Sequence, residues 1–187
     1  MNDEYEQREG QALDALSQRF LTALAYKDRG ELDDAEELLR EIIATEPRLP
    51  EPHMELARIL LDTERLTAAE PHAREAIQWL EQGGQWNEEV PEHVMHGLAH
   101  ALLAEILRRR ADEDEVLFGD PAVFHGLVRE AQHHFAKANE LDPSDEYASY
   151  HAFFLGIPGK TPRGEEDDVI DVDDDPLIPG GSGPAEA

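Results

Sequence analysis

The feature that most constrains this sequence is a pattern of small and apolar residues that recurs after 34 positions. It is clearest in residues 30–47, where apolar side chains follow the i, i+3, i+4, i+7, i+8 spacing of one helical face: Ala35, Leu38, Leu39, Ile42 and Ile43. Three of these positions return in two later segments, as Ala69, Ala73, Ala76 and as Ala131, Phe135, Ala138. A repeat of this length with two helices per unit predicts an all-α chain of stacked helical hairpins.

A single helix with this stripe cannot be stable alone, because ordering its residues costs more free energy than burying five modest side chains returns. The stripe therefore needs neighbours, and the later copies supply them. The small residues at shared positions favour helices that pack at a short interaxial distance.

Two runs, Ala25–Glu36 and Glu130–Pro143, resemble the tetratricopeptide repeat family. The resemblance covers about residues 15–156 and implies a short α-solenoid of about three helix-turn-helix hairpins. We place these hairpins at about residues 15–48, 49–82 and 91–144, with a capping helix at 145–156. Together they form a predicted helical repeat domain of residues 1–156. The chain departs from the family pattern at Glu64, which stands at the usual turn glycine, and in extra residues between the helices of the third hairpin.

Several boundaries follow from local signals. The first helix is expected from about Gln11 to Lys27. The acidic loop Ala111–Gly119 contains Val116, Leu117 and Phe118, and we expect it to fold onto the end of the stack. Asp120-Pro121 is a helix start, with an N-cap followed by an N1 proline. A last helix is expected at about Glu146–Leu155.

Residues 157–187 are rich in Gly, Pro, Ser and acids, and are predicted to form a disordered acidic tail. Two interpretations remain open for it: a solubilising extension, or a short interaction motif.

The net charge of −27 argues against nucleic acid and anionic membranes as partners, because phosphate groups require a basic face. The acidity fits either a solvated surface or attraction to a basic partner. The chain has no cysteine, no membrane-span-length apolar run and no basic signal region near Met1, so a cytoplasmic location is expected.

In the resembled family, the first helix of each hairpin lines a groove that holds a segment of a partner protein. Carried over to this sequence, the resemblance implies a groove lined by Phe20, Leu24, Lys27, Met54, Glu55, Arg58, Leu61, His96, His100 and Leu103. Phe20 and Leu24 stand where a clamp for a terminal carboxylate needs polar groups. The expected partner is instead a peptide segment with apolar anchors and basic flanks.

The predicted function is therefore a non-enzymatic protein-interaction module, either a scaffold or a chaperone-like adaptor, with no catalytic residues and no cofactor. One alternative is a secretion-type chaperone, a class that is also small, acidic and built on three such repeats. A second is a metal-binding protein or metal-dependent enzyme using His96 and His100, which lie four residues apart and need further ligands such as His133 or His134. The partner and the oligomeric state are not fixed by the sequence.

Overall fold

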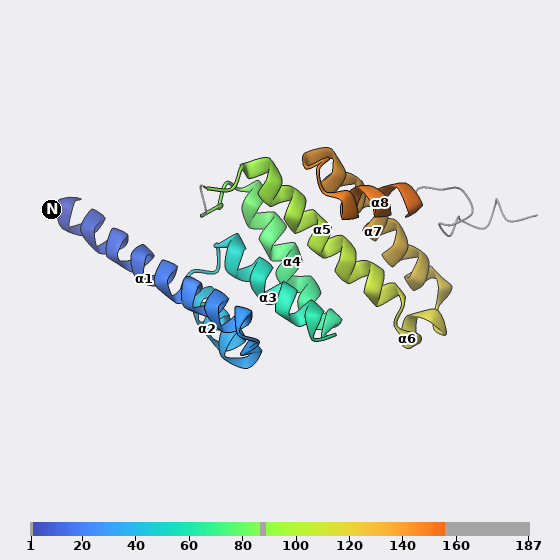
Figure 1. The fold of residues 1–187 in the computed structure, drawn as a ribbon, viewed down its shortest axis with the longest axis horizontal. Helices are drawn as coiled ribbons and strands as arrows, with labels where there is room; N and C mark the ends of the chain where they lie inside the picture. The colour runs from blue at the N-terminus through green and yellow to red at the C-terminus, as the bar shows by residue number, and fades with distance from the viewer. Residues whose placement is uncertain (1, 87–88, 156–187) are drawn as a thin grey trace, which may run out of the picture.

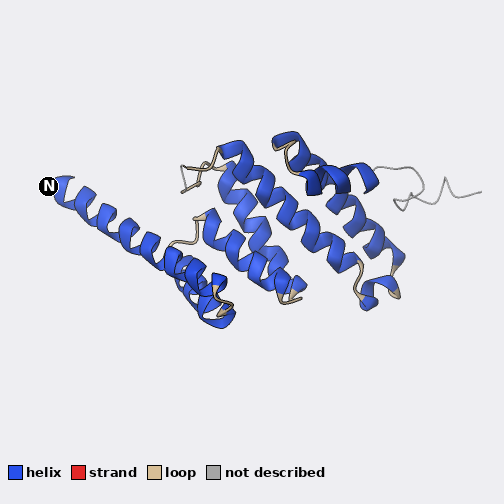
Figure 2. Ribbon diagram, in the orientation of Figure 1, coloured by secondary structure: helices blue, strands red, loops and turns tan. Residues whose placement is uncertain are grey.

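The structure is a computed structural model that describes the backbone of residues 2–86 and 89–155, and side chains from residue 13 to 152 outside that gap. Within these residues the chain forms eight helices and no strand (Figure 2). The predicted all-α class is confirmed, whereas the predicted tail, residues 157–187, lies outside the described residues.

The helices follow one another with short connections (Figure 1). Their bounds are α1 (Asn2–Asp28), α2 (Leu32–Thr45), α3 (Pro50–Asp62), α4 (Leu66–Glu81), α5 (Glu92–Ala111), α6 (Asp114–Leu117), α7 (Pro121–Leu141) and α8 (Glu146–Leu155). Each helix packs against the next in the chain, and α5 also packs against α7 and α3. Every helix in the described part of the chain is too short or too polar to cross a bilayer.

The start of α1 differs from the sequence prediction. The helix begins at Asn2 rather than near Gln11, and its amino-terminal half extends away from the other helices (Figure 1).

The helices pair as α1–α2, α3–α4 and α5–α7, and the positions that the three repeats share are buried in the second helix of each pair. Ala35, Ala69 and Ala131 are completely buried in α2, α4 and α7. The other shared positions are at most 1% exposed, namely Leu39, Ala73, Phe135, Ile42, Ala76 and Ala138. Side chains of this size allow the neighbouring helix to approach closely, as the repeat predicted.

The turns within the first two pairs also share their geometry. Gly30, between α1 and α2, has φ of +79°, and Glu64, 34 residues later between α3 and α4, has φ of +56°. A left-handed backbone is strained for a side chain with a Cβ, at a cost of about 1–2 kcal/mol. The missing turn glycine therefore leaves the turn unchanged in shape but less favourable in energy.

A buried carboxylate joins the first pair of helices to the second. Glu36 of α2 is 5% exposed and accepts a hydrogen bond of 3.0 Å from Nη1 of Arg65, in the turn between α3 and α4. Arg40 of its own helix pairs with the same carboxylate. The hydrogen bond from Arg65 holds the pKa of Glu36 below its ordinary value, against the opposing effect of burial.

The same arrangement recurs 34 residues later, where it joins the second pair to the third. Glu70 of α4 pairs with Arg74 of its own helix at 2.7 Å and with Arg110 near the end of α5. Arg74 also reaches Glu130 of α7 at 2.7 Å. Each of the first two units thus presents a carboxylate that an arginine of the following unit neutralises.

The last helix covers one side of the third pair, as the prediction of a capping helix required. Ala148 of α8 is completely buried, and the ring of His151 stacks on Phe135 of α7 with centroids 4.8 Å apart. The predicted helix start at Asp120-Pro121 is confirmed as well, because the Asp120 carboxylate accepts a 2.9 Å hydrogen bond from the Ala122 N–H.

We predict that Ala69→Leu destabilises the protein by about 1–3 kcal/mol, because the added carbons have no space between helices already in contact. The adjacent Ala68 is exposed, so Ala68→Leu is a matched control expected to change the unfolding free energy by less than about 0.5 kcal/mol. Urea denaturation of the two variants checks this, and equal midpoints would refute the close-packing argument.

Candidate functional site

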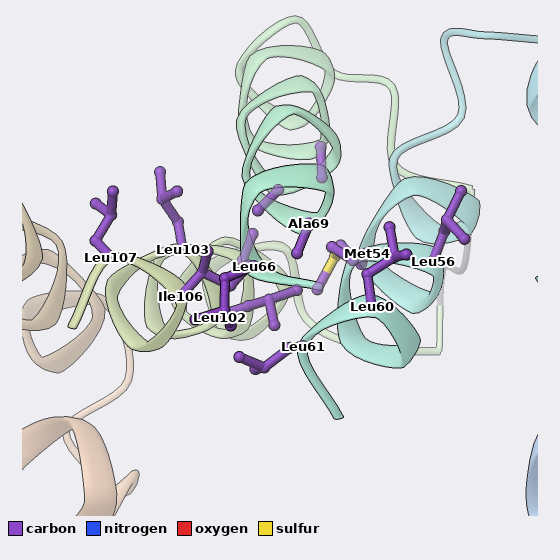
Figure 3. Packing of buried hydrophobic residues seen from close by; sticks show 14 of the residues in the cluster. Met54, Leu56, Leu60, Leu61, Leu66, Ala69, Leu102, Leu103, Ile106 and Leu107 are labelled. Atoms are coloured by element: carbon purple, nitrogen blue, oxygen red, sulfur yellow. The ribbon is translucent and has the colours of Figure 1, made fainter. Parts of the chain in front are cut away.

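Ten residues were predicted to line a binding groove, and four of them are core residues. Met54, Leu61 and Leu103 are 4%, 6% and 1% exposed, and His100 is 7% exposed. Figure 3 shows the first three among the packed side chains between α3, α4 and α5. These four side chains are not available to a partner in this structure, and we remove them from the predicted surface.

The exposed side of α5 is not the one assigned from the sequence. The predicted positions His96, His100 and Leu103 lie on the sides that pack against neighbouring helices, and His100 contacts His134 of α7. The least buried positions in the middle of α5 are instead Leu98, which is 37% exposed, and Ala101. The outward face is therefore displaced from the predicted one.

Four of the remaining predicted residues, together with these two positions, are partly exposed side chains on the first helix of each pair. We call this the first-helix strip and define it as Leu24, Lys27, Glu55, Arg58, Leu98 and Ala101. An ion pair between Lys27 and Glu55 joins α1 to α3 along it, and Arg58 Nε lies 4.0 Å from the same carboxylate. The strip carries apolar ends around a charged centre.

On α5, the carboxylate of Glu105 is buried one turn beyond Ala101, on the same face of the helix. Glu105 is 9% exposed and accepts hydrogen bonds from Arg108 Nε at 2.8 Å, from Arg109 Nε at 2.7 Å and from the Tyr147 hydroxyl of α8 at 2.6 Å. Burial alone would raise the pKa of Glu105, but these hydrogen bonds outweigh it and hold the pKa at about 2. Arg109 also reaches Glu64 at 2.9 Å. This group is satisfied internally and fixes α8 against α5.

Phe20, the first of the predicted groove residues, has a structural role. Its ring lies against Trp86, with centroids 5.7 Å apart, and it packs on the cluster that contains Leu16 and Ile42. The Trp86 N–H donates a 2.7 Å hydrogen bond to Glu51 of α3. The segment after α4 is thereby held against α1 and α3, so Phe20 is only partly accessible at the margin of the strip.

One pair of histidines lies between α3 and α4, and another lies between α5 and α7. His53 and His72 approach with Nδ1 atoms 3.1 Å apart, and His100 and His134 with Nδ1 atoms 2.8 Å apart. In each pair one neutral ring donates and the other accepts. Burial, together with the proximity of other imidazoles, lowers the pKa of both His100 and His134 to about 4.

Among the described side chains, His96 and His100 have no third residue placed to complete a metal site, and no group of three or more His, Cys, Asp or Glu is placed to hold a metal ion. His96 faces Glu92 of its own helix at 3.8 Å, while His100 is engaged with His134. The two residues four positions apart therefore do not converge on a common ligand set.

A surface hollow of about 520 Å³ lies over α2, lined by Asp33, Glu36, Glu37, Arg40, Glu41, Ala44 and Arg65. Its central groups are the ion pairs that join the first two helix pairs. The buried carboxylate there, Glu36, is neutralised by Arg40 and Arg65, which is the opposite of a carboxylate pair tuned for acid-base chemistry.

No protein-family model matches this chain, and no curated protein matches its sequence.

We predict that the protein loses stability as the pH falls from about 6.5 toward about 4. The unfolded chain protonates His100 and His134 near pH 6.5, whereas the folded chain resists protonation until about pH 4, so the stability contributed by the neutral pair is complete above pH 6.5. The loss per histidine is on the order of 2 kcal/mol. Glu105 contributes in a lower window, between its ordinary pKa and about 2.

Thermal unfolding at pH 7 and pH 5 tests this, and His134→Asn should reduce the difference between the two pH values. Part of the difference should remain, because burial also lowers the pKa of His53 and His72. The exposed His93 provides the control, His93→Asn. An identical pH response in wild type and His134→Asn would contradict the assignment.

Proposed function

We propose that this protein is a non-enzymatic interaction module, a short α-solenoid of the tetratricopeptide type that holds a segment of a partner protein along the first-helix strip. The observation that carries the proposal is the strip itself. On α3, packing covers nearly every position except Glu55, Arg58 and Asp62, which share one helical face. Accessible side chains on the first helix of each successive pair provide the kind of surface that a bound segment requires.

The chemistry of the strip supports a mixed partner. Leu24 and Leu98 offer apolar contacts, and Lys27, Glu55 and Arg58 offer charges that are already partly compensated. The charge of −27 over the whole chain favours a partner with basic flanks and speeds its approach. The partner segment is therefore apolar at its anchors and basic beyond them.

The arrangement of titratable groups supports binding rather than catalysis. Glu36 and Glu105 are each neutralised by two or more cationic or hydroxyl donors. A carboxylate held in this way is a weak base and cannot act as a general acid near neutral pH. These groups join helices together, which suits a scaffold whose function depends on the position of its surface.

We predict that Arg58→Glu combined with Leu98→Glu reduces partner recovery at least tenfold in affinity capture followed by mass spectrometry. The substitutions reverse a charge and remove an apolar contact on the strip without entering the core, since Arg58 keeps 42% of its side chain exposed and Leu98 is 37% exposed. Substitution of Met54 is unsuitable, because its burial would confound binding with unfolding.

The control is Ala136→Glu, an acidic change at an exposed position of α7, outside the strip. Each protein is first checked by circular dichroism for an unchanged melting temperature. If the double variant melts like wild type and captures the same proteins in the same amounts, the strip is not the binding surface.

A further inference from the structure

The connection between α5 and α7 carries a second surface feature that the strip does not include. Within the first two helix pairs, tight turns at residues 29–31 and 63–65 join the two helices. The two helices of the third pair are joined by a longer connection, residues 112–120, that contains α6. The sequence predicted that its three apolar residues fold onto the end of the stack. Only Val116 does so, at 9% exposed, while Leu117 and Phe118 are 48% and 85% exposed.

The exposure of Phe118 is imposed by an ordered backbone. The Phe118 N–H donates to Asp114 O at 3.0 Å, and the Gly119 N–H to Val116 O at 3.2 Å. Gly119 is required at its position, because a Cβ there would lie 2.3 Å from Glu115 O. With Val116 packed in the core cluster beneath, the phenyl ring is held in solvent by the geometry of the turn.

Leu117, Phe118 and Val123 gather three exposed apolar side chains within the α6–α7 segment, and we call them the α6 patch. Val123 of α7 is 48% exposed. Scattered exposed apolar residues are ordinary, but several together on one short segment indicate an interaction site. Covering a phenyl ring of this exposure would stabilise a complex by the apolar area that it removes from water.

Charge around the α6 patch selects the partner. Asp114, Glu115 and Asp120 are exposed beside it, and Asp112, also exposed, is paired with Arg108 at 3.2 Å. The nearest arginines are already engaged, Arg109 with Glu64 and Glu105, and Arg110 with Glu70. The surface around the apolar residues is therefore acidic. A second copy of this chain, with its own charge of −27, would bring acids against acids.

We propose that the α6 patch docks a cationic amphipathic segment of another protein, whose apolar side covers Phe118 and Leu117 and whose Lys or Arg residues meet the surrounding carboxylates. This surface is separate from the first-helix strip, so the two sites can be tested independently. Residues 112–120 would thus have a binding role that the stacking of the helices does not require.

The experiment uses the full chain and two fluorescent synthetic peptides. One is an amphipathic helix of Leu and Lys, and the other has Glu at every Lys position. Fluorescence anisotropy at low and moderate salt should show binding of the cationic peptide alone. Phe118→Ala with Leu117→Ala should weaken it at least tenfold, whereas the control Leu21→Ala, at a 63% exposed residue of α1, should leave it unchanged. Asp114→Asn with Glu115→Gln should reduce the salt dependence.

Three outcomes would overturn the proposal: equal binding of both peptides, equal binding by wild type and the Phe118 variant, or loss of binding only in Arg58→Glu with Leu98→Glu. The last result would place the cationic peptide on the first-helix strip and leave the proposed function standing. Because Phe118 and Leu117 are exposed, their replacement is expected to leave the melting temperature unchanged, which separates lost binding from lost fold.

Discussion

The fold depends on close packing between successive helix pairs, and the alanines of the 34-residue pattern make that packing possible. Ala35, Ala69 and Ala131 are completely buried at equivalent positions of α2, α4 and α7. None of these helices has enough apolar surface to be stable in isolation. The carboxylates of Glu36 and Glu70 add a directional contact, because each accepts from an arginine of the following pair. Stability is thus shared along the chain between neighbours.

The part of the fold that depends on local pattern could be predicted from the sequence. The buried stripe of the second helices, the N-cap at Asp120 and the bounds of α8 all agree with the structure. The outward face of α5 could not be predicted, because apolar residues lie on every side of this helix and its periodicity does not select one. The pairing of His100 with His134 is a tertiary contact between residues of α5 and α7 that lie 34 positions apart in the sequence, which no local spacing encodes.

The ion pairs that join the helix pairs also have a signal in the sequence. Glu36 and Arg40 recur 34 residues later as Glu70 and Arg74, so the carboxylates that join the helix pairs repeat with the same period as the alanines. The exposure of Phe118 was the opposite of the expectation for an apolar loop residue. Burying Val116 satisfies the packing of the turn, and the turn geometry then directs the next two side chains outward.

The central claim, that the helix pairs stabilise one another in series, is tested most directly by native-state hydrogen exchange on wild type and Glu70→Ala, with exposed Glu81→Ala as the control. Removing the Glu70 carboxylate leaves Arg110 without its partner in the preceding pair. The account predicts that amides of α3 and α4 and of α5 and α7 lose protection together. Loss of protection confined to the turn of α4 around residue 70, with the third pair unaffected, would contradict it.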